Sequence, residues 1–103
     1  MFDIIRSAAF TEWLNKLKDR HARMRVLARL DRAAMGNLGD VQPVGNGVSE
    51  MRIHYGPGYR LYYMQRVRQI LVMLCAGDKS TQSKDIENAK AIATTWQELE
   101  NHE

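Results

Sequence analysis

The sequence predicts a small α+β domain in which an N-terminal strand and a helical hairpin pack on a mostly antiparallel sheet, followed by a C-terminal helix. Apolar residues recur at helical spacing in the first third of the chain and again near its end. The middle of the chain alternates with the period of two that strands require. The chain has 103 residues, the usual size of one domain, so we expect a single domain over residues 1–103.

Two helices are predicted in the first third of the chain, after a short strand at residues 2–5. Ser7 is the expected N-cap of the first helix and Asp19 that of the second, because both side chains can accept a hydrogen bond from a free backbone N–H. Gly36 stands where a C′ glycine would end the second helix. The two apolar stripes are Phe10, Trp13, Leu14 and Leu17, then Val26, Leu27, Leu30, Ala33 and Ala34.

Three further strands are predicted in the middle of the chain. Residues 37–47 are rich in glycine and indicate an irregular loop. Residues 48–55 and 59–64 alternate around Gly56-Pro57-Gly58, a strong turn pattern. After a second turn at residues 67–69, residues 70–76 are apolar on both faces, as in a central strand covered on both sides.

A loop at residues 77–82 leads to the last predicted helix, with Ser80 or Thr81 as its expected N-cap. The apolar stripe of this helix consists of Ile86, Ala89, Ile92, Ala93, Trp96 and Leu99. The spacing of this stripe predicts a helix that packs one face on the sheet.

The pairing of the two middle strands predicts where polar side chains gather. A three-residue turn would pair Ile53 with Leu61. The polar face of this hairpin then consists of Arg52, His54, Arg60 and Tyr62. Cationic groups on one face repel one another unless an anion lies among them, and phosphate is the expected anion. A solvated polar face is the alternative. Lys79 follows the predicted central strand and is expected to reach the same face.

The charge distribution favours a polyanionic partner. The net charge is +3, but residues 6–68 hold twelve Lys and Arg against five Asp and Glu, whereas residues 69–103 hold three against six. A basic body of this kind is typical of nucleic-acid-binding proteins. Arg25, Arg29 and Arg32 share one face of the second predicted helix. They are candidates for RNA binding, with a solvated helix face as the alternative.

Several classes of protein are disfavoured. The longest apolar run, residues 70–76, is far shorter than the roughly twenty residues of a membrane span, and the N-terminus lacks the pattern of a signal peptide. We therefore expect a cytoplasmic protein without a membrane partner. The single Cys75 lies in that run and is expected to be a small buried hydrophobe. No His or Cys pair has metal-ligand spacing, and no nucleophile or phosphate-loop motif occurs, so neither a metal nor a cofactor is expected.

Two long motifs identify a family. The stretch from Glu50 to Tyr63, EMRIHYGPGYRLYY, and residues 74–82, LCAGDKSTQ, together resemble the RelE/ParE superfamily of toxins. Within it the sequence is most similar to the HigB-like "addiction module killer protein" group. Trp13-Leu14 and residues 36–40 fit that group too, so the resemblance covers nearly the whole chain. It implies a RelE-like fold and the toxin of a type II toxin–antitoxin module.

The resemblance also implies a chemistry. RelE and HigB members are metal-independent endoribonucleases that cleave mRNA on the ribosome and so inhibit translation. Arg60 falls on a strand arginine that stabilises the transition state, and Lys79 falls near a second such arginine. Arg52 and His54 fall on two basic strand positions. RelE uses a C-terminal tyrosine in proton transfer, which residues 83–85 do not supply. His54 is the first candidate for that role, because imidazole titrates near neutral pH, and Tyr62 is the second.

Partners follow from the same resemblance. A helix-turn-helix antitoxin is expected to bind the toxin in a hetero-oligomer, on an exposed apolar patch built from Met or Trp side chains. The alternative function is that of a ParE-type toxin, which inhibits DNA gyrase without cleaving RNA on the same fold. The clustered cations favour the nuclease, because a gyrase inhibitor does not need a phosphate-binding face.

Overall fold

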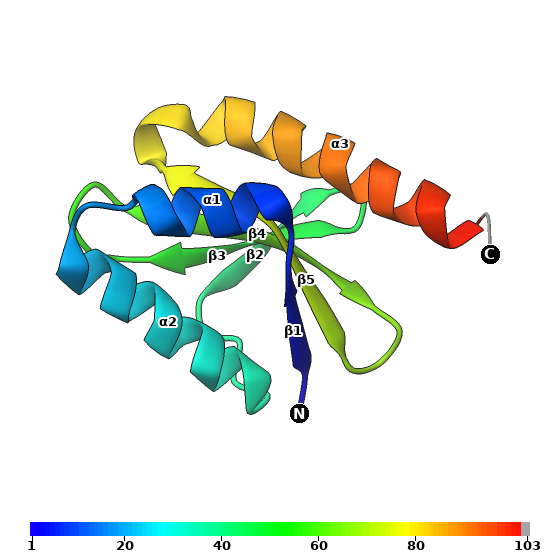
Figure 1. Ribbon diagram of the computed structural model, residues 1–103, viewed down its shortest axis with the longest axis horizontal. Helices are drawn as coiled ribbons and strands as arrows, with labels where there is room; N and C mark the ends of the chain where they lie inside the picture. The colour runs from blue at the N-terminus through cyan, green and yellow to red at the C-terminus, as the bar shows by residue number, and fades with distance from the viewer. Residues whose placement is uncertain (102–103) are drawn as a thin grey trace.

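The computed structural model describes the backbone of residues 1–101 and the side chains of residues 1–97. These described residues form five strands, three α-helices and one 3-10 turn (Figure 1). The strands are β1 (Asp3–Arg6), β2 (Val41–Gly45), β3 (Val48–Ile53), β4 (Tyr59–Arg66) and β5 (Ile70–Asp78). The helices are α1 (Ala8–Lys16), α2 (Arg20–Ala34) and α3 (Gln82–Asn101), and the 3-10 turn is η1 (Lys79–Thr81).

All five strands belong to one mixed sheet with the order β1-β5-β4-β3-β2. Strand β1 pairs with β5 in parallel, and the other three pairings are antiparallel. The predicted α+β class, the mostly antiparallel sheet and the C-terminal helix are thus confirmed. Strand β5 lies between β1 and β4, which explains why its residues are apolar on both faces.

Helices cover both faces of the sheet. Apolar side chains of α1 and α2 pack with Met51, Leu61 and Met73 on one face. Those of α3, including Ala89 and Ala93, pack with the other face. In Figure 1, α1 and α2 follow one another in blue and cyan, and α3 runs along the top of the view from yellow to red. The buried apolar residues of the strands therefore divide between two cores, which the sheet separates.

The predicted ends of the first two helices are confirmed. The Ser7 hydroxyl accepts a hydrogen bond from the Phe10 N–H and donates one to the Leu74 carbonyl, at 3.1 and 2.6 Å. Asp19 accepts hydrogen bonds from the N–H groups of His21 and Ala22 at the start of α2. Gly36 follows the C-cap with a φ of +100°, a conformation that favours glycine.

The loop predicted over residues 37–47 is partly wrong, because residues 41–45 form β2. This strand lies at the edge of the sheet, where Pro43 can be accommodated without a ladder hydrogen bond. Asn46 and Gly47 then form a two-residue turn, both with positive φ, as type I′ hairpins require. The Asn46-Gly47 dipeptide favours such a hairpin, but the many glycines around it led to the prediction of an irregular loop.

The predicted register of the β3–β4 hairpin is wrong by two residues. Ile53 pairs with Tyr59 rather than Leu61, and a five-residue connection, 54–58, replaces the three-residue turn. Tyr55 leaves the ladder: its ring lies 4.5 Å below the Arg25 guanidinium, and its hydroxyl donates to Asp19 at 3.3 Å. A shift of two leaves every side chain on its predicted face of the sheet.

The start of α3 also differs from the prediction. Asp78 caps η1 by accepting a hydrogen bond from the Ser80 N–H, and α3 itself begins at Gln82. Thr81 instead donates its hydroxyl hydrogen to Asp85, at 2.6 Å. Leu99, the last residue of the predicted apolar stripe, lies outside the described side chains.

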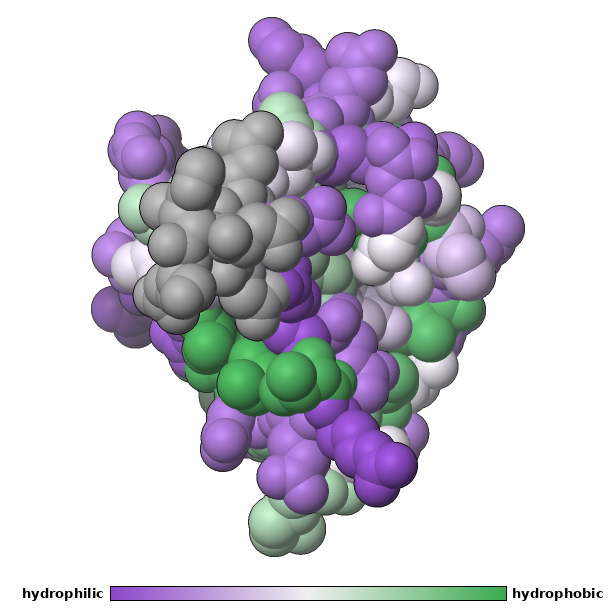
Figure 2. All heavy atoms as spheres, turned by 90° about the vertical axis from the view of Figure 1, so that its right-hand side faces the viewer, coloured by the Kyte–Doolittle hydropathy of each residue, from purple (hydrophilic) through white to green (hydrophobic). Residues whose placement is uncertain are grey.

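The surface carries few large apolar side chains among the described residues. Met1, Met24, Met35 and Val67 are the exposed ones, with Val67, in the β4–β5 turn, 71% exposed. Figure 2 faces the side on which this turn and the end of α3 lie, and it shows a compact apolar patch on a largely polar surface. In the described part of the chain, no helix is long and apolar enough to cross a membrane.

Candidate functional site

A hollow of about 430 Å³ lies at the end of the sheet where the β3–β4 connection approaches the end of β5. Residues 52–60 and Lys79 line it. Arg52, His54, Arg60 and Lys79 therefore surround one space, although Lys79 is far from the others in sequence. The strand order explains this, because Tyr59 pairs with Asp78, the residue before Lys79.

The two arginines lie directly opposite each other on paired strands, Arg52 on β3 and Arg60 on β4. The Arg60 side chain is only 15% exposed. Its Nη1 donates to the Gly58 carbonyl at 3.0 Å, and its buried Nε has no hydrogen-bond partner among the described residues. Arg52 donates from Nε to Glu50 at 3.1 Å and from Nη2 to the side-chain oxygen of Gln42. Both guanidinium groups are thus held against the sheet.

Glu50 is a site residue that sequence reasoning missed. Its side chain is 2% exposed and lies beneath the two arginines, with Oε2 at 3.9 Å from the Arg60 Nε. Gln82, the first residue of α3, donates to both carboxylate oxygens at 3.2 and 3.4 Å. The period of two already placed Glu50 on the face of Arg52. Its position was therefore predictable from the alternation, whereas its burial and its pairing with the arginines were not.

His54 lies just beyond β3 at the exposed rim of the hollow. Its Nε2 lies 2.7 Å from Oδ2 of Asp40, which comes from the connection between α2 and β2. The hydrogen bond from His54 lowers the pKa of the Asp40 carboxyl. Asp40 therefore orients the imidazole ring beside the two arginines. The chain separation of the two residues hid this pair from sequence reasoning.

Tyr62 does not lie in the hollow. It is fully buried under α3, and its hydroxyl has no hydrogen-bond partner among the described residues. Burial raises its pKa well above the usual range. The predicted pairing of Ile53 with Leu61 would place Tyr62 opposite Arg52, which is wrong, because the observed register pairs Tyr62 with Glu50. In this conformation Tyr62 cannot exchange a proton with a molecule in the hollow.

Cys75 is buried, as predicted. It pairs across the strands with Tyr62, and its thiol donates to the Asp85 carbonyl. Burial raises the pKa of the thiol to about 12. A thiol of this kind is protonated at neutral pH and is a poor nucleophile. Among the described residues, no three His, Cys, Asp or Glu side chains lie together in a group that could hold a metal ion.

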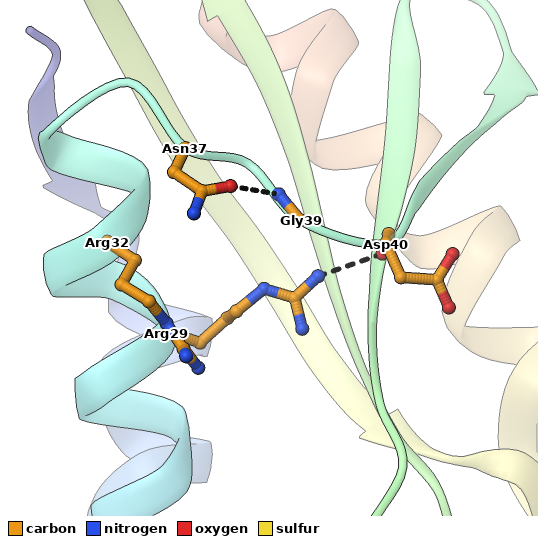
Figure 3. A pocket seen from close by; sticks show the side chains of 5 residues that line it. All are labelled: Arg29, Arg32, Asn37, Gly39 and Asp40. Carbon is orange, nitrogen blue, oxygen red and sulfur yellow. Dashed lines mark hydrogen bonds between the residues drawn. The ribbon is translucent and has the colours of Figure 1, made fainter.

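The three α2 arginines do not share one environment. Arg29 is only 9% exposed, and its guanidinium donates to the backbone carbonyls of Leu38, Asp40 and Arg52. Figure 3 shows its side chain reaching from α2 toward Asp40, with Arg32 on the same helix. The exposed face predicted for Arg29 is wrong, because residues 37–40 fold over it. The Arg29 guanidinium thus bonds to the protein's own backbone carbonyls.

Arg25 and Arg32 are exposed and line a second hollow of about 280 Å³ together with Arg52 and His54. The two hollows share residues 52–54, so they adjoin one another. The basic side chains consequently extend from Lys79 across the end of the hairpin to α2. An extended polyanion fits such an arrangement better than a single small anion does.

One family model matches most of this chain. The model of the family described as "Phage derived protein Gp49-like (DUF891)" matches residues 12–97. The chain belongs to the Gp49-like family. An uncharacterised protein of Haemophilus influenzae (strain ATCC 51907 / DSM 11121 / KW20 / Rd) is 45% identical to it over 84 residues, covering 82% of this chain and 85% of the relative. The range that the family model matches spans the positions of the basic residues of both hollows.

The site of this Gp49-like protein is suited to phosphate chemistry. Two guanidinium groups and one ammonium group surround a space in which a phosphate would replace water. Cations fixed in advance stabilise negative charge that develops during a reaction, since they need not reorganise. The His54–Asp40 pair adds a group that can hold or release a proton at the rim.

Proposed function

We propose that this Gp49-like protein is the toxin of a toxin–antitoxin module and that it cleaves mRNA on the ribosome. The family is associated with RelE-like toxins of such modules. The single observation that supports a nuclease is the convergence of Arg52, Arg60 and Lys79, with His54, around one hollow. A helix-turn-helix antitoxin would neutralise the protein by binding to it.

The proposed reaction is a transesterification within the RNA chain. The ribose 2′-oxygen attacks the adjacent phosphorus and loses its proton, the bond to the 5′-oxygen breaks, and that oxygen receives a proton. The products are a 2′,3′-cyclic phosphate and a 5′-hydroxyl. Negative charge accumulates on the phosphate oxygens at the transition state, where Arg60 and Lys79 would stabilise it. His54 would transfer one of the two protons.

The experiment compares three proteins in a reconstituted translation reaction, with mRNA 5′ ends mapped by primer extension with and without ribosomes. We expect the wild-type protein to produce ends in the ribosomal A site only when ribosomes are present. Arg60→Ala should reduce cleavage by a factor of about 100 to 1000, as loss of a transition-state contact typically does. Arg68→Ala is the matched control, because it removes the same charge from the turn at the other end of β4.

Intact mRNA and undisturbed translation with the wild-type protein would contradict the nuclease. Cleavage by Arg60→Ala at the wild-type rate would leave the nuclease in place but remove Arg60 from its site. If mRNA stays intact with the wild-type protein, gyrase supercoiling is the assay to make next, since a ParE-type toxin would inhibit it and leave mRNA intact.

A further inference from the structure

A buried carboxylate joins the two arginines of the hollow. Glu50 is 2% exposed, and its Oε1 accepts a hydrogen bond from the Arg52 Nε at 3.1 Å. Its Oε2 lies 3.9 Å from the Arg60 Nε, a buried nitrogen without any hydrogen-bond partner in the described part of the chain. Burying a charge is costly unless it is paired, so Glu50 and the arginines stabilise one another.

Three elements meet at this carboxylate. Glu50 lies on β3, Arg60 on β4, and Gln82 at the start of α3 donates to both of its oxygens. Since Arg52 and Arg60 pair directly across the two strands, their positive charges would repel each other without an intervening anion. Glu50 supplies that anion from below the hollow. Its burial keeps it from an RNA phosphate on the open side.

We propose that Glu50 is a positioning residue, which holds the Nε edges of Arg52 and Arg60 inward so that their terminal nitrogens meet the reacting phosphate. Glu50 does not touch the RNA and acts only through the arginines. This inference rests on the proposed function for its effect on cleavage. The orientation of the arginines themselves can be measured without any RNA.

Loss of the Glu50 charge is expected to lower the rate of cleavage without weakening RNA binding. Glu50→Gln retains the shape of the side chain but removes a negative charge beneath the hollow, so electrostatics alone would leave RNA binding unchanged or stronger. The arginines, however, lose their fixed direction. Misplacement of a catalytic group by about 1 Å can reduce a rate about 100-fold. We therefore expect kcat to fall by a factor of about 10 to 100, with KM unchanged or lower.

The first measurement is cleavage of mRNA on programmed ribosomes by the wild-type protein, Glu50→Gln, Glu50→Asp and Glu12→Gln. Glu50→Asp keeps the charge and should recover part of the lost kcat. Glu12→Gln is the matched control, since Glu12 is an exposed carboxylate paired with Lys16 on α1, and we expect wild-type kinetics from it. A wild-type kcat in Glu50→Gln would overturn the proposal, as would a loss that tracks only the unfolded fraction.

The second measurement is hydrogen exchange of the arginine Nε–H groups by NMR in the free protein. We expect slow exchange for Arg52 in the wild type and exchange at least about 10-fold faster in Glu50→Gln, because a lost hydrogen bond exposes the group to water. Arg29, whose Nε donates to the Leu38 carbonyl rather than to Glu50, should stay protected and reports that the fold is intact. If the Nε–H exchange of Arg52 is the same in Glu50→Gln as in the wild type, the proposal for Glu50 is overturned, whether or not the wild-type protein cleaves RNA. A wild-type protein that does not cleave RNA contradicts only the proposed function.

Discussion

At the scale of single residues, Arg29 and Arg32 on α2 illustrate how burial changes the role of a charge. Arg29→Ala would remove the guanidinium that donates to three partly buried backbone carbonyls, those of Leu38, Asp40 and Arg52. We expect it to reduce the free energy of unfolding by about 3 kcal/mol, because hydrogen bonds from a charged group are strong and their loss leaves acceptors unsatisfied. Arg32→Ala removes an exposed side chain and should change that energy by less than about 0.5 kcal/mol.

Urea denaturation of both variants checks this prediction. For Arg32→Ala we expect an unchanged free energy of unfolding but a lower affinity for RNA. If Arg29→Ala unfolds at the same urea concentration as the wild type, water replaces the guanidinium and the residue belongs with the exposed arginines after all.

The sequence indicated the cations of the site better than the groups that hold them. Period-two alternation placed Arg52 and Arg60 on one face of the sheet. The predicted register is wrong by two residues, and a shift by an even number leaves each side chain on the same face. Neither strand alternation nor helical spacing reports how deeply a side chain is buried, so the burial of Glu50 on β3 and of Arg29 on α2 could not be recognised. Their partners come from α3, β3 and the segment before β2, which only the folded chain brings together.

At the scale of elements, Gly77 sets the distance between β5 and the start of α3. A Cβ at this position would lie 1.9 Å from the Asp85 Oδ2 and 2.9 Å from the Thr81 Oγ1. We expect Gly77→Ala to displace the Asp85 carboxylate and to break its hydrogen bond with Thr81. Overpacking of this kind reduces the free energy of unfolding by about 1 to 3 kcal/mol, which thermal or urea denaturation would measure.

A double-mutant cycle provides the control for Gly77. In an Asp85→Ala background the added methyl group meets no carboxylate, so Gly77→Ala should cost less than about 1 kcal/mol there. Equal costs in the two backgrounds would show that the backbone of β5, rather than Asp85, resists the substitution.

Elements were predicted well where local chemistry decides them. Ser7 and Asp19 begin helices because their own side chains cap them, and the apolar run of β5 reflects cover on both faces. The edge strand β2 was missed because glycine and proline hid a strand that depends on pairing with β3. The predicted β3–β4 turn is two residues too short. Tyr55 leaves the ladder to contact Arg25 on α2 and the N-cap Asp19, and these tertiary contacts cannot be predicted from local sequence.

At the scale of the whole molecule, the helices occupy both faces of the sheet and leave its end open between them. The hollow forms at this end, where the β3–β4 connection and the end of β5 are not covered by α3. The net charge of +3 is small, so the local arrangement of cations matters more for RNA binding than the overall charge does.

The salt dependence of RNA binding distinguishes local from overall charge. For single-stranded RNA, the logarithm of the binding constant falls with the logarithm of the salt concentration by about 0.7 for each phosphate that the protein neutralises. Contacts from Arg52, Arg60 and Lys79 contribute about −2 to this slope, and phosphates bound by the exposed α2 arginines add to it. Lys79→Ala should reduce the magnitude of the slope by about 0.7. Arg68→Ala lowers the net charge equally but should leave the slope unchanged.

The measurement uses a 2′-O-methylated oligonucleotide, which binds without being cleaved, titrated by fluorescence anisotropy at several salt concentrations. Equal slopes for Lys79→Ala and Arg68→Ala would mean that RNA responds to the overall charge and that the hollow is not its binding site.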